Sequence, residues 1–438
     1  TVDWQTGSIK TATFTATSGE GYFCNTAGGS FEVDLPAGSA GAIVSIQDYN
    51  NTFDSNSLTV DPNGSEKING GDAGGRIELT TEGEGVTLVY IDSTVGWRSI
   101  HQSTFADTGQ NPAFVAASGG NATLTCGDFK THVFTGPGTF TVSCAGNAAG
   151  SNSVDYVVVA GGGGANQAYA AGGGAGGFRI ANFYGLPSPT MSPLSNPTNL
   201  PVSAQGYPIT VGSGGGAPPT PSGVGDNGNP SVFSTITATA GGGGGSGGSP
   251  SPSSCAPGKP GGSGGGAGGF GPGTKNGGTG NTPPVSPPQG NNGGNTTSPG
   301  GGYTSGGGGG AGAAAVNVTS PGPSAEDLSP GGIGSFVSDS FFGPTAPSYG
   351  TPGPVSNVRY FAGGGGGGWY NGGPLPTSTI APGGAGGGGP GTTQGPNPLP
   401  APSQNGTVNT GGGAGGGGNS AGGYGGGSGI VIIRYKFQ

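Results

Sequence analysis

The chain has 438 residues, of which 110 are Gly and 39 are Pro, and only 7% are charged. Ordinary proteins contain roughly 7% Gly and 5% Pro, so an average globular composition is excluded. The formal net charge is −9 without a basic cluster, which argues against nucleic acid and anionic membranes as partners. No apolar run approaches the ~20 residues of a transmembrane helix. The chain begins at Thr1 rather than at Met, so we expect a fragment or a processed product.

Residues 1–103 are expected to form a compact, acidic all-β module. They hold 13 acidic and 4 basic side chains. Short runs rich in β-branched and aromatic residues alternate with turn signals such as LPAG, DPNG and TEGEG, and no segment shows a helical period. The strand-like runs are TATFTAT, SFEVDL, AIVSIQDY, SLTVD, GRIELTT and GVTLVYID.

Residues 104–160 are expected to form a second small β unit. The run NATLTCGDFKTHVFTGPGTFTVSC predicts three strands, with GPG as a hairpin turn. VDYVVVA and the terminal GIVIIRYKF are apolar on both faces, so each needs neighbours on both sides. The simplest arrangement pairs them, or stacks them in one sandwich. The sequence therefore predicts a β-sandwich from 104–160 plus 429–438, with 161–428 as an insertion whose ends lie close together.

The insertion is expected to fold as a bundle of polyproline II helices joined by turns. Disorder is the default for such Gly and Pro content, and collagen is excluded because no G-X-Y frame is kept. A polyproline II helix has three residues per turn and no internal hydrogen bonds, but glycine lets several such rods approach and bond to one another. The clearest runs are 161–164, 172–177, 241–248, 261–269, 306–310, 363–368, 383–389, 411–418 and 422–429.

No catalytic, metal or cofactor site is expected. His101 and His132 lack partner motifs and are interpreted as surface or β-edge residues. Cys126 and Cys144 flank the expected hairpin and are either bridged or free, and no CxxC spacing indicates zinc. The acids Asp48, Asp54, Asp61 and Asp72 fit no EF-hand spacing and are interpreted as solvated turn residues. The pairs Glu32/Asp34 and Glu82/Glu84 are interpreted as the exposed face of an acidic sheet rather than as a glycosidase pair.

Aromatic residues in the loops of the insertion are the candidate binding residues. One interpretation is that they seal the rod ends from water; the other is recognition of carbohydrate or protein by exposed rings. Two aromatic loops, 333–361 and 369–380, carry little charge. The candidate receptor-binding residues are Phe341, Phe342, Tyr349, Trp369 and Tyr370.

Several motifs resemble bacteriophage tail-fibre proteins. GYFCNT, DLPAG, AIVSIQDYNNTFDSNSLTVDPNG and VTLVYIDSTVGW resemble a tail-fibre module. HVFTGPGTFTVS, VDYVVVAGGGGA, YPITVG, STITATAGGGGG and GSGIVIIRY resemble the glycine-rich domain of phage fibres. The rod bundle is similar to the tip adhesin of T-even-type tail fibres, in which loops at the far end of a glycine-rich sandwich touch the host receptor.

This resemblance implies a structural virion protein of the tail fibre, extracellular and not an enzyme. Its implied partners are a host surface receptor, either a glycan or an outer-membrane protein, and other virion fibre proteins. A homotrimer is expected, with a monomeric cap as the competitor. Alternatives are a passive structural fibre or capsid decoration, an ice-binding protein, and a silk-like glycine-rich protein.

Overall fold

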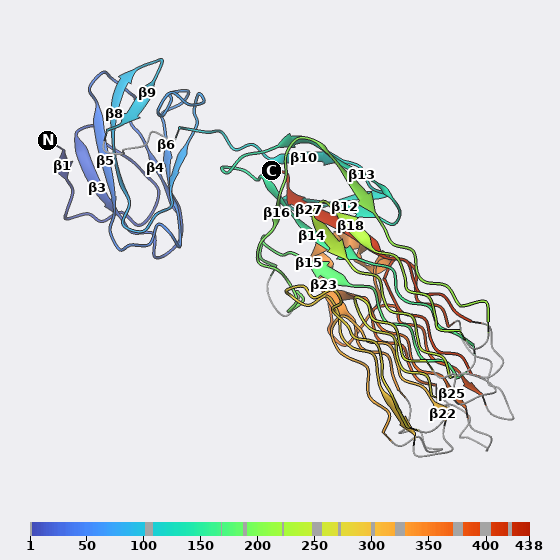
Figure 1. The fold of residues 1–438 in the computed structure, drawn as a ribbon. Coiled ribbons are helices and arrows are strands. Elements are labelled where there is room, and N and C mark those ends of the chain that lie inside the picture. The colour runs from blue at the N-terminus through green and yellow to red at the C-terminus, as the bar shows by residue number, and fades with distance from the viewer. Residues whose placement is uncertain are drawn as a thin grey trace. The chain divides into compact units, whose positions relative to one another are not determined.

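The computed structural model describes the chain outside residues 1, 101–107, 168, 187–190, 221–222, 248–255, 270–272, 299–302, 320–328, 371–379, 395–403 and 419–422. The chain forms two compact units, Thr1–Phe114 with Gly146–Asn152 and Val115–Ala145 with Ser153–Gln438 (Figure 1). The first unit thus extends beyond residue 103. One reason is that Gln110 and Arg76 exchange backbone hydrogen bonds of 2.9 and 3.1 Å, and the Gly109 N–H donates to the Ile68 carbonyl over 3.0 Å.

The described residues contain no helix with the length and apolar character needed to cross a bilayer.

The first unit is all-β, as its alternating apolar runs predicted, and its strands form a sandwich of two sheets. The chain passes repeatedly between the sheets, so that successive strands of each pair in parallel, and β7, β8 and β9 add antiparallel strands. Trp97, Phe53 and Leu88 lie in the core between the sheets. One sheet has the order β1 (Asp3–Trp4), β3 (Glu20–Cys24), β5 (Ile43–Asp48), β8 (Gly85–Asp92), β9 (Gly96–Ser99), and the other β2 (Phe14–Thr15), β4 (Phe31–Asp34), β6 (Leu58–Asp61), β7 (Ile77–Leu79).

The second unit begins with another two-sheet sandwich. Its first sheet has the order β10 (Val115–Ser118), β13 (Gly138–Ala145), β17 (Gly206–Thr210), β18 (Ser231–Phe233), β19 (Ile236–Ala238). Its second has the order β11 (Ala122–Cys126), β12 (Phe129–Phe134), β27 (Ile430–Lys436), β14 (Ser153–Val159), β15 (Phe178–Ile180), with β16 (Leu200–Pro201) also paired to β14. Five of these strands, β15 to β19, come from residues 161–428, which were expected to form the bundle and its loops, so the insertion contributes to the sandwich as well.

The pairing of the two strands that flank the insertion is confirmed. β14 and β27 are antiparallel neighbours, with Val157 opposite Ile432 and Val159 opposite Ile430. One face of their sheet contributes Val158 and Ile433 to a core against the other sheet. The opposite face contributes to a second core beneath the segment 335–362. The strands are apolar on both faces because both faces are covered.

The GPG turn does not make the expected hairpin. β12 pairs with β11 and β27, whereas β13 pairs with β10 and β17, so Gly136–Gly138 carries the chain from one sheet to the other. The tight hairpin lies instead at Gly127-Asp128, where Cys126 is opposite Phe129 and Gly127 has φ +57°. Local turn chemistry predicted a reversal but not the sheet that each strand joins.

The glycine runs form extended rods that lie side by side (Figure 1). Their hydrogen bonds have the three-residue period of polyproline II. Residues 170–177 are the central example. Each backbone N–H in this rod donates to a neighbouring rod over 2.7–3.1 Å, and every third one goes to the same neighbour. Residues 170, 173 and 176 bond to 411–417, residues 171, 174 and 177 to 239–245, and residues 172 and 175 to 306–309.

Close packing of backbones explains the glycine content. The carbonyl groups of 170–175 accept from three further rods, around 161–164, 263–266 and 365–368, so this rod has six bonded neighbours. A Cβ placed on Gly173 would lie 2.1 Å from the Gly163 carbonyl oxygen, and one on Gly172 would lie 2.1 Å from that of Gly365. Neither glycine has a positive φ. Glycine is therefore required here for the space it leaves and not for its backbone freedom.

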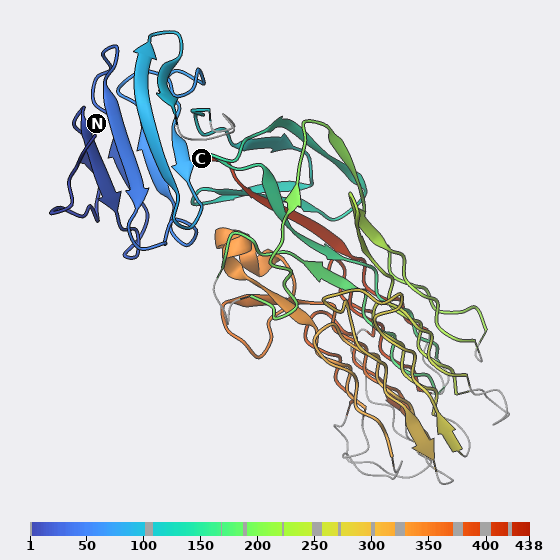
Figure 2. The same ribbon diagram turned by 60° about the vertical axis from the view of Figure 1, so that its left-hand side comes forward.

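The remaining elements lie at opposite ends of the rods. The labels of Figure 1 place β22 and β25 at the end remote from the sandwich and β23 beside β15. The remote elements pair as β22 (Tyr303–Thr304), β25 (Trp369–Tyr370), β26 (Thr393–Gln394). β20 (Gly273–Lys275) and β21 (Thr296–Ser298) form a separate two-stranded antiparallel sheet. The elements beside the sandwich are β23 (Ser335–Ser338), the 3-10 helices η3 (Asp339–Phe341) and η4 (Gly343–Ser348), and β24 (Val358–Phe361) (Figure 2).

Candidate functional site

Three of the five candidate aromatics belong to a core at the sandwich end. Phe341 is fully buried and Phe342 is 1% exposed. The Phe342 ring stacks on that of the half-buried Tyr349, with centroids 5.0 Å apart. Thr131 of β12 donates its hydroxyl to the Phe341 carbonyl over 2.8 Å, which fixes this segment to the sheet. The side chains of Phe341 and Phe342 are therefore not accessible to a partner in this structure.

Trp369 lies at the remote end but is only 3% exposed. Its strand lies between β22 and β26, with Trp369 opposite Thr304 and Thr393. The backbone N–H of Trp369 donates to the Thr392 carbonyl over 3.0 Å. This placement fits an aromatic cap on the rod ends. Tyr370 follows in the same strand, but its side chain and the segment 371–379 lie outside the described residues.

The structure thus separates the two aromatic loops that the sequence grouped together. Within the second unit, Phe341, Phe342 and Tyr349 lie beside the sandwich, and Trp369-Tyr370 lies at the opposite end of the rods. Aromatic content gave no signal for this difference, because a core ring and a contact ring are the same residue type. The alternating SFVS and VRYF runs that form β23 and β24 were the available sign of a covering hairpin.

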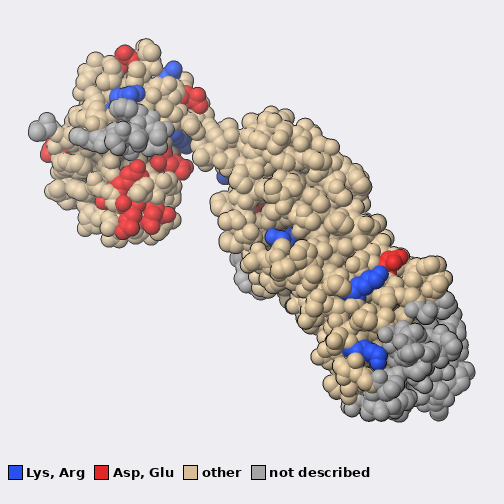
Figure 3. Space-filling model, viewed as in Figure 1, with Lys and Arg blue, Asp and Glu red and all other residues tan. Residues whose placement is uncertain are grey.

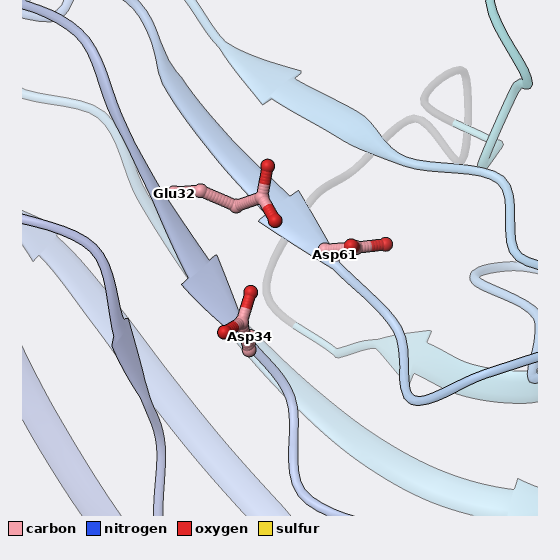
Figure 4. Close-up of side chains that lie close together, drawn as sticks. All are labelled: Glu32, Asp34 and Asp61. Atoms are coloured by element: carbon pink, nitrogen blue, oxygen red, sulfur yellow. The ribbon is translucent and has the colours of Figure 1, made fainter.

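An acidic cluster lies on the smaller sheet of the first unit (Figure 4). Glu32 and Asp34 lie on β4, and Asp61 on β6 is directly opposite Asp34. Arg76 forms ion pairs with Glu32 at 3.3 Å and with Asp61 at 3.0 Å. Burial is the main cause that raises the pKa of Glu32, and hydrogen bonding to Asp34 raises this pKa further. Arg76 supplies the countercharge and also lines a hollow of about 360 Å³.

Three interpretations of acidic residues were wrong. Asp61 was interpreted as a solvated turn residue, but it is the last residue of strand β6. Asp48 is 5% exposed and is not a solvated turn residue. Its carboxylate accepts backbone hydrogen bonds from Thr52, Phe53 and Gly83, at 2.9, 3.2 and 3.1 Å, and so organises two loops. Glu82 and Glu84 lie in the turn before β8 rather than on a strand face.

His132 is buried in the second unit, in contrast to the surface or edge position expected. Its strand β12 lies between β11 and β27. Nδ1 lies 2.7 Å from the Gly119 carbonyl, and Nε2 lies 3.1 Å from the Tyr435 hydroxyl. Burial lowers the pKa of His132. A partner 303 residues away in sequence could not be read from local spacing. His101 lies outside the described residues.

The described cysteines are free thiols. Cys126 and Cys144 lie on β11 and β13, in different sheets, and are not bridged. Burial raises the pKa of the Cys24 thiol to about 12, so this thiol is neutral at pH 7. Cys255 lies outside the described residues.

A buried ion pair joins the strands that flank the insertion. Asp155 of β14 is opposite Arg434 of β27, with Oδ2 and Nη1 3.6 Å apart and side chains 0% and 4% exposed. Asp155 also accepts the backbone N–H of Phe183 over 2.8 Å, and the Arg434 guanidinium lies 3.7 Å from the centre of the Phe129 ring. Desolvation outweighs the Phe183 bond and the Arg434 charge, and raises the pKa of Asp155 to about 6.

We expect the second unit to gain stability from Asp155 as the pH falls from 8 to 5. The pKa of about 6 is above the ordinary 3.8, so the folded state binds a proton that the unfolded state releases between those values. The gain in the free energy of unfolding is about 1.4 kcal/mol between pH 8 and 5 and reaches about 3 kcal/mol only below pH 3.8. This contribution is lost as the pH rises through 6. Calorimetry of the second unit against pH measures it.

The Asp155→Asn variant is the control for this pH dependence. His132 has the opposite effect below pH 6.5, because its lowered pKa makes the folded state resist protonation. The difference between the wild type and Asp155→Asn isolates Asp155, and Asp155→Asn with Arg434→Gln serves if the single variant does not fold. A wild type that loses stability relative to Asp155→Asn between pH 7 and 5 would contradict the prediction.

Comparison with known families identifies the second unit. The chain matches the glycine-rich domain family over residues 134–436, which covers most of its length, and it belongs to that family. No curated protein matches the chain.

Proposed function

We propose that the chain is a structural fibre protein of a tailed-phage virion, which binds the host surface through the remote end of its glycine-rich bundle. The observation that carries the proposal is the rod lattice. Rods bonded on several sides form a stiff extension, and recognition is commonly placed in loops on such a rigid scaffold. The resemblance of its motifs to phage tail fibres supports the virion assignment.

The proposed contact region is the remote end, where β25 leads into the segment 371–379. The other end of the rods is closed by the sandwich, since β14 and β27 pair there. The partner is a host glycan or outer-membrane protein. Phe341, Phe342 and Tyr349 are left out because their rings pack in or against the core. The protein acts by binding, without catalysis.

The experiment is competition for adsorption by the soluble chain. Replacing 371–379 by a Gly-Ser segment of equal length, together with Tyr370→Ala, should weaken competition tenfold or more, about 1.4 kcal/mol, with an unchanged melting temperature. Trp369 is kept, because truncating a buried Trp costs about 3–5 kcal/mol and would confuse binding with unfolding. Phe183→Ala, which removes an exposed ring beside the sandwich, is the control and should compete normally.

Undiminished competition by the folded replacement would remove this segment from the site. A wild-type chain that does not compete at all would favour a passive fibre or a capsid decoration.

We also propose that the chain forms a homotrimer, with a monomeric cap as the alternative. The molecular mass measured in solution decides between the two.

A further inference from the structure

A row of aromatic rings lies on the outer face of the larger sheet of the first unit. Side chains alternate across a strand, so Tyr22 and Cys24 of β3 enter the core while Phe23 faces outward. Trp4 of β1 and Tyr49, just after β5, lie on either side of Phe23. Ring centroids are 5.0 Å apart for Trp4 and Phe23 and 6.5 Å apart for Phe23 and Tyr49. Trp4 is 39% exposed and Tyr49 53% exposed.

The ring of Trp4, the first of the row, packs over Gly21. Gly21 lies opposite Trp4 in the ladder, and a Cβ at Gly21 would lie 2.7 Å from the indole Cδ2. The absence of a side chain therefore lets the indole lie against the backbone of β3. With one part of the ring covered in this way, the exposed part faces solvent in a fixed orientation.

The last ring is held by its own backbone. The Tyr49 N–H donates to the Cys24 carbonyl over 2.9 Å. Asp48, buried immediately before it, accepts the N–H groups of Thr52 and Phe53 and fixes the following turn. Ordering these rings in advance lowers the entropic cost of binding a ligand.

Polar side chains border the row. Gln47 lies beside Phe23 in the ladder. Its side-chain amide donates a hydrogen bond to the Gly83 carbonyl over 2.9 Å. Asn50 and Asn51 follow Tyr49 and are exposed. The face therefore combines apolar ring surface with neutral amide groups.

We propose that the row formed by Trp4, Phe23 and Tyr49 binds a neutral oligosaccharide. The C–H faces of sugar rings pack on aromatic rings, and the amides can bond to their hydroxyls. Three rings in series fit an extended chain better than one small molecule. This site is on the first unit and does not rest on the function proposed for the remote end of the bundle.

Charge decides between this occupant and the alternatives. Residues 1–103 have a formal charge of −9, and Asp and Glu cover more of the first unit's surface than Lys and Arg in the view of Figure 3. A second copy docked on this unit would therefore bring like charge to like charge. An anionic polysaccharide would be repelled in the same way. A neutral sugar chain meets no such repulsion, which is why it is preferred here over self-association.

The test uses the full chain on an array of neutral glycans, followed by calorimetric titration of the tightest binder. Trp4→Ala and Tyr49→Ala should each weaken binding tenfold or more. Gly21→Ala should do the same by lifting the indole from β3, which tests the seat without removing the ring. Ile91→Ala on β8 of the same sheet, 46% exposed, is the matched control and should bind normally.

Three results would overturn the proposal. One is a wild-type chain that binds no neutral glycan on the array. Another is an equal loss of binding in Ile91→Ala, which would mean that this face of the sheet binds nonspecifically through its apolar surface. The third is self-association that Trp4→Ala abolishes, which would make the face an interface between copies. Adsorption through segment 371–379 is measured separately and can succeed or fail independently of all three.

Discussion

A chain that ends at residue 428 should lose the folding transition of the second unit and keep that of the first. β27 supplies Ile430, Val431, Ile432, Ile433 and Tyr435, all fully buried. At roughly 1.5–3 kcal/mol per buried apolar side chain, their removal costs on the order of 10 kcal/mol. That is comparable to the whole stability of a typical domain.

The loss should reach both the sandwich and the bundle. β27 is the central strand between β12 and β14, so its absence leaves two sheet edges unpaired and exposes the core on both faces. Calorimetry and hydrogen exchange would show one remaining transition, with rapid exchange in the glycine rods. A chain that ends at Phe437 is the control and should unfold like the full chain, because it lacks only the exposed Gln438. Slow exchange in the rods of the chain ending at 428 would show that the bundle is independent of the sandwich.

The pairing of β14 and β27 could be predicted from the sequence for a physical reason. Runs such as VDYVVVA and GIVIIRY place apolar residues on both faces of a strand, and only a strand covered on both faces can bury them. Two such runs at the borders of a glycine-rich segment left few alternatives to pairing. The glycine runs were equally informative, since their number fits a lattice of bonded rods.

Long-range placement is what the sequence could not supply. Thr-rich strands after Pro-Gly turns can join either sheet, so the partner of β13 was missed. His132 and Asp48 are buried because distant groups satisfy their hydrogen bonds, namely Tyr435 for the histidine and Gly83 for the carboxylate. Phe341 and Phe342 were assigned to a contact surface because their residue type does not distinguish a covering hairpin from an exposed loop. The alternating runs SFVS and VRYF around them were the only local sign of the hairpin.

The Gly173→Ala variant should destabilise the second unit by about 3 kcal/mol, the upper part of the range for overpacking. Its new Cβ would lie 2.1 Å from the Gly163 carbonyl oxygen and 2.7 Å from the carbonyl carbon. The rod cannot move away, because the rods around it bond to it on several sides. Gly265→Leu, whose Cβ would lie 2.1 Å from the Gly243 oxygen, should prevent the unit from folding.

Gly425→Ala is the matched control, because it changes a glycine of another rod without a clash. A Cβ there would lie 3.5 Å from the Gly215 carbonyl oxygen, an ordinary contact, and neither Gly173 nor Gly425 has a positive φ. The intrinsic backbone cost of the two substitutions is therefore similar, and their difference measures the clash alone. Its neighbour Gly426, whose Cβ would lie 2.1 Å from the Gly162 oxygen, should behave like Gly173 when changed to Ala. Urea unfolding of the three variants measures these differences in free energy. Equal stability of Gly425→Ala and Gly426→Ala would mean that the rods can spread apart, and that close packing is not what requires glycine in this bundle.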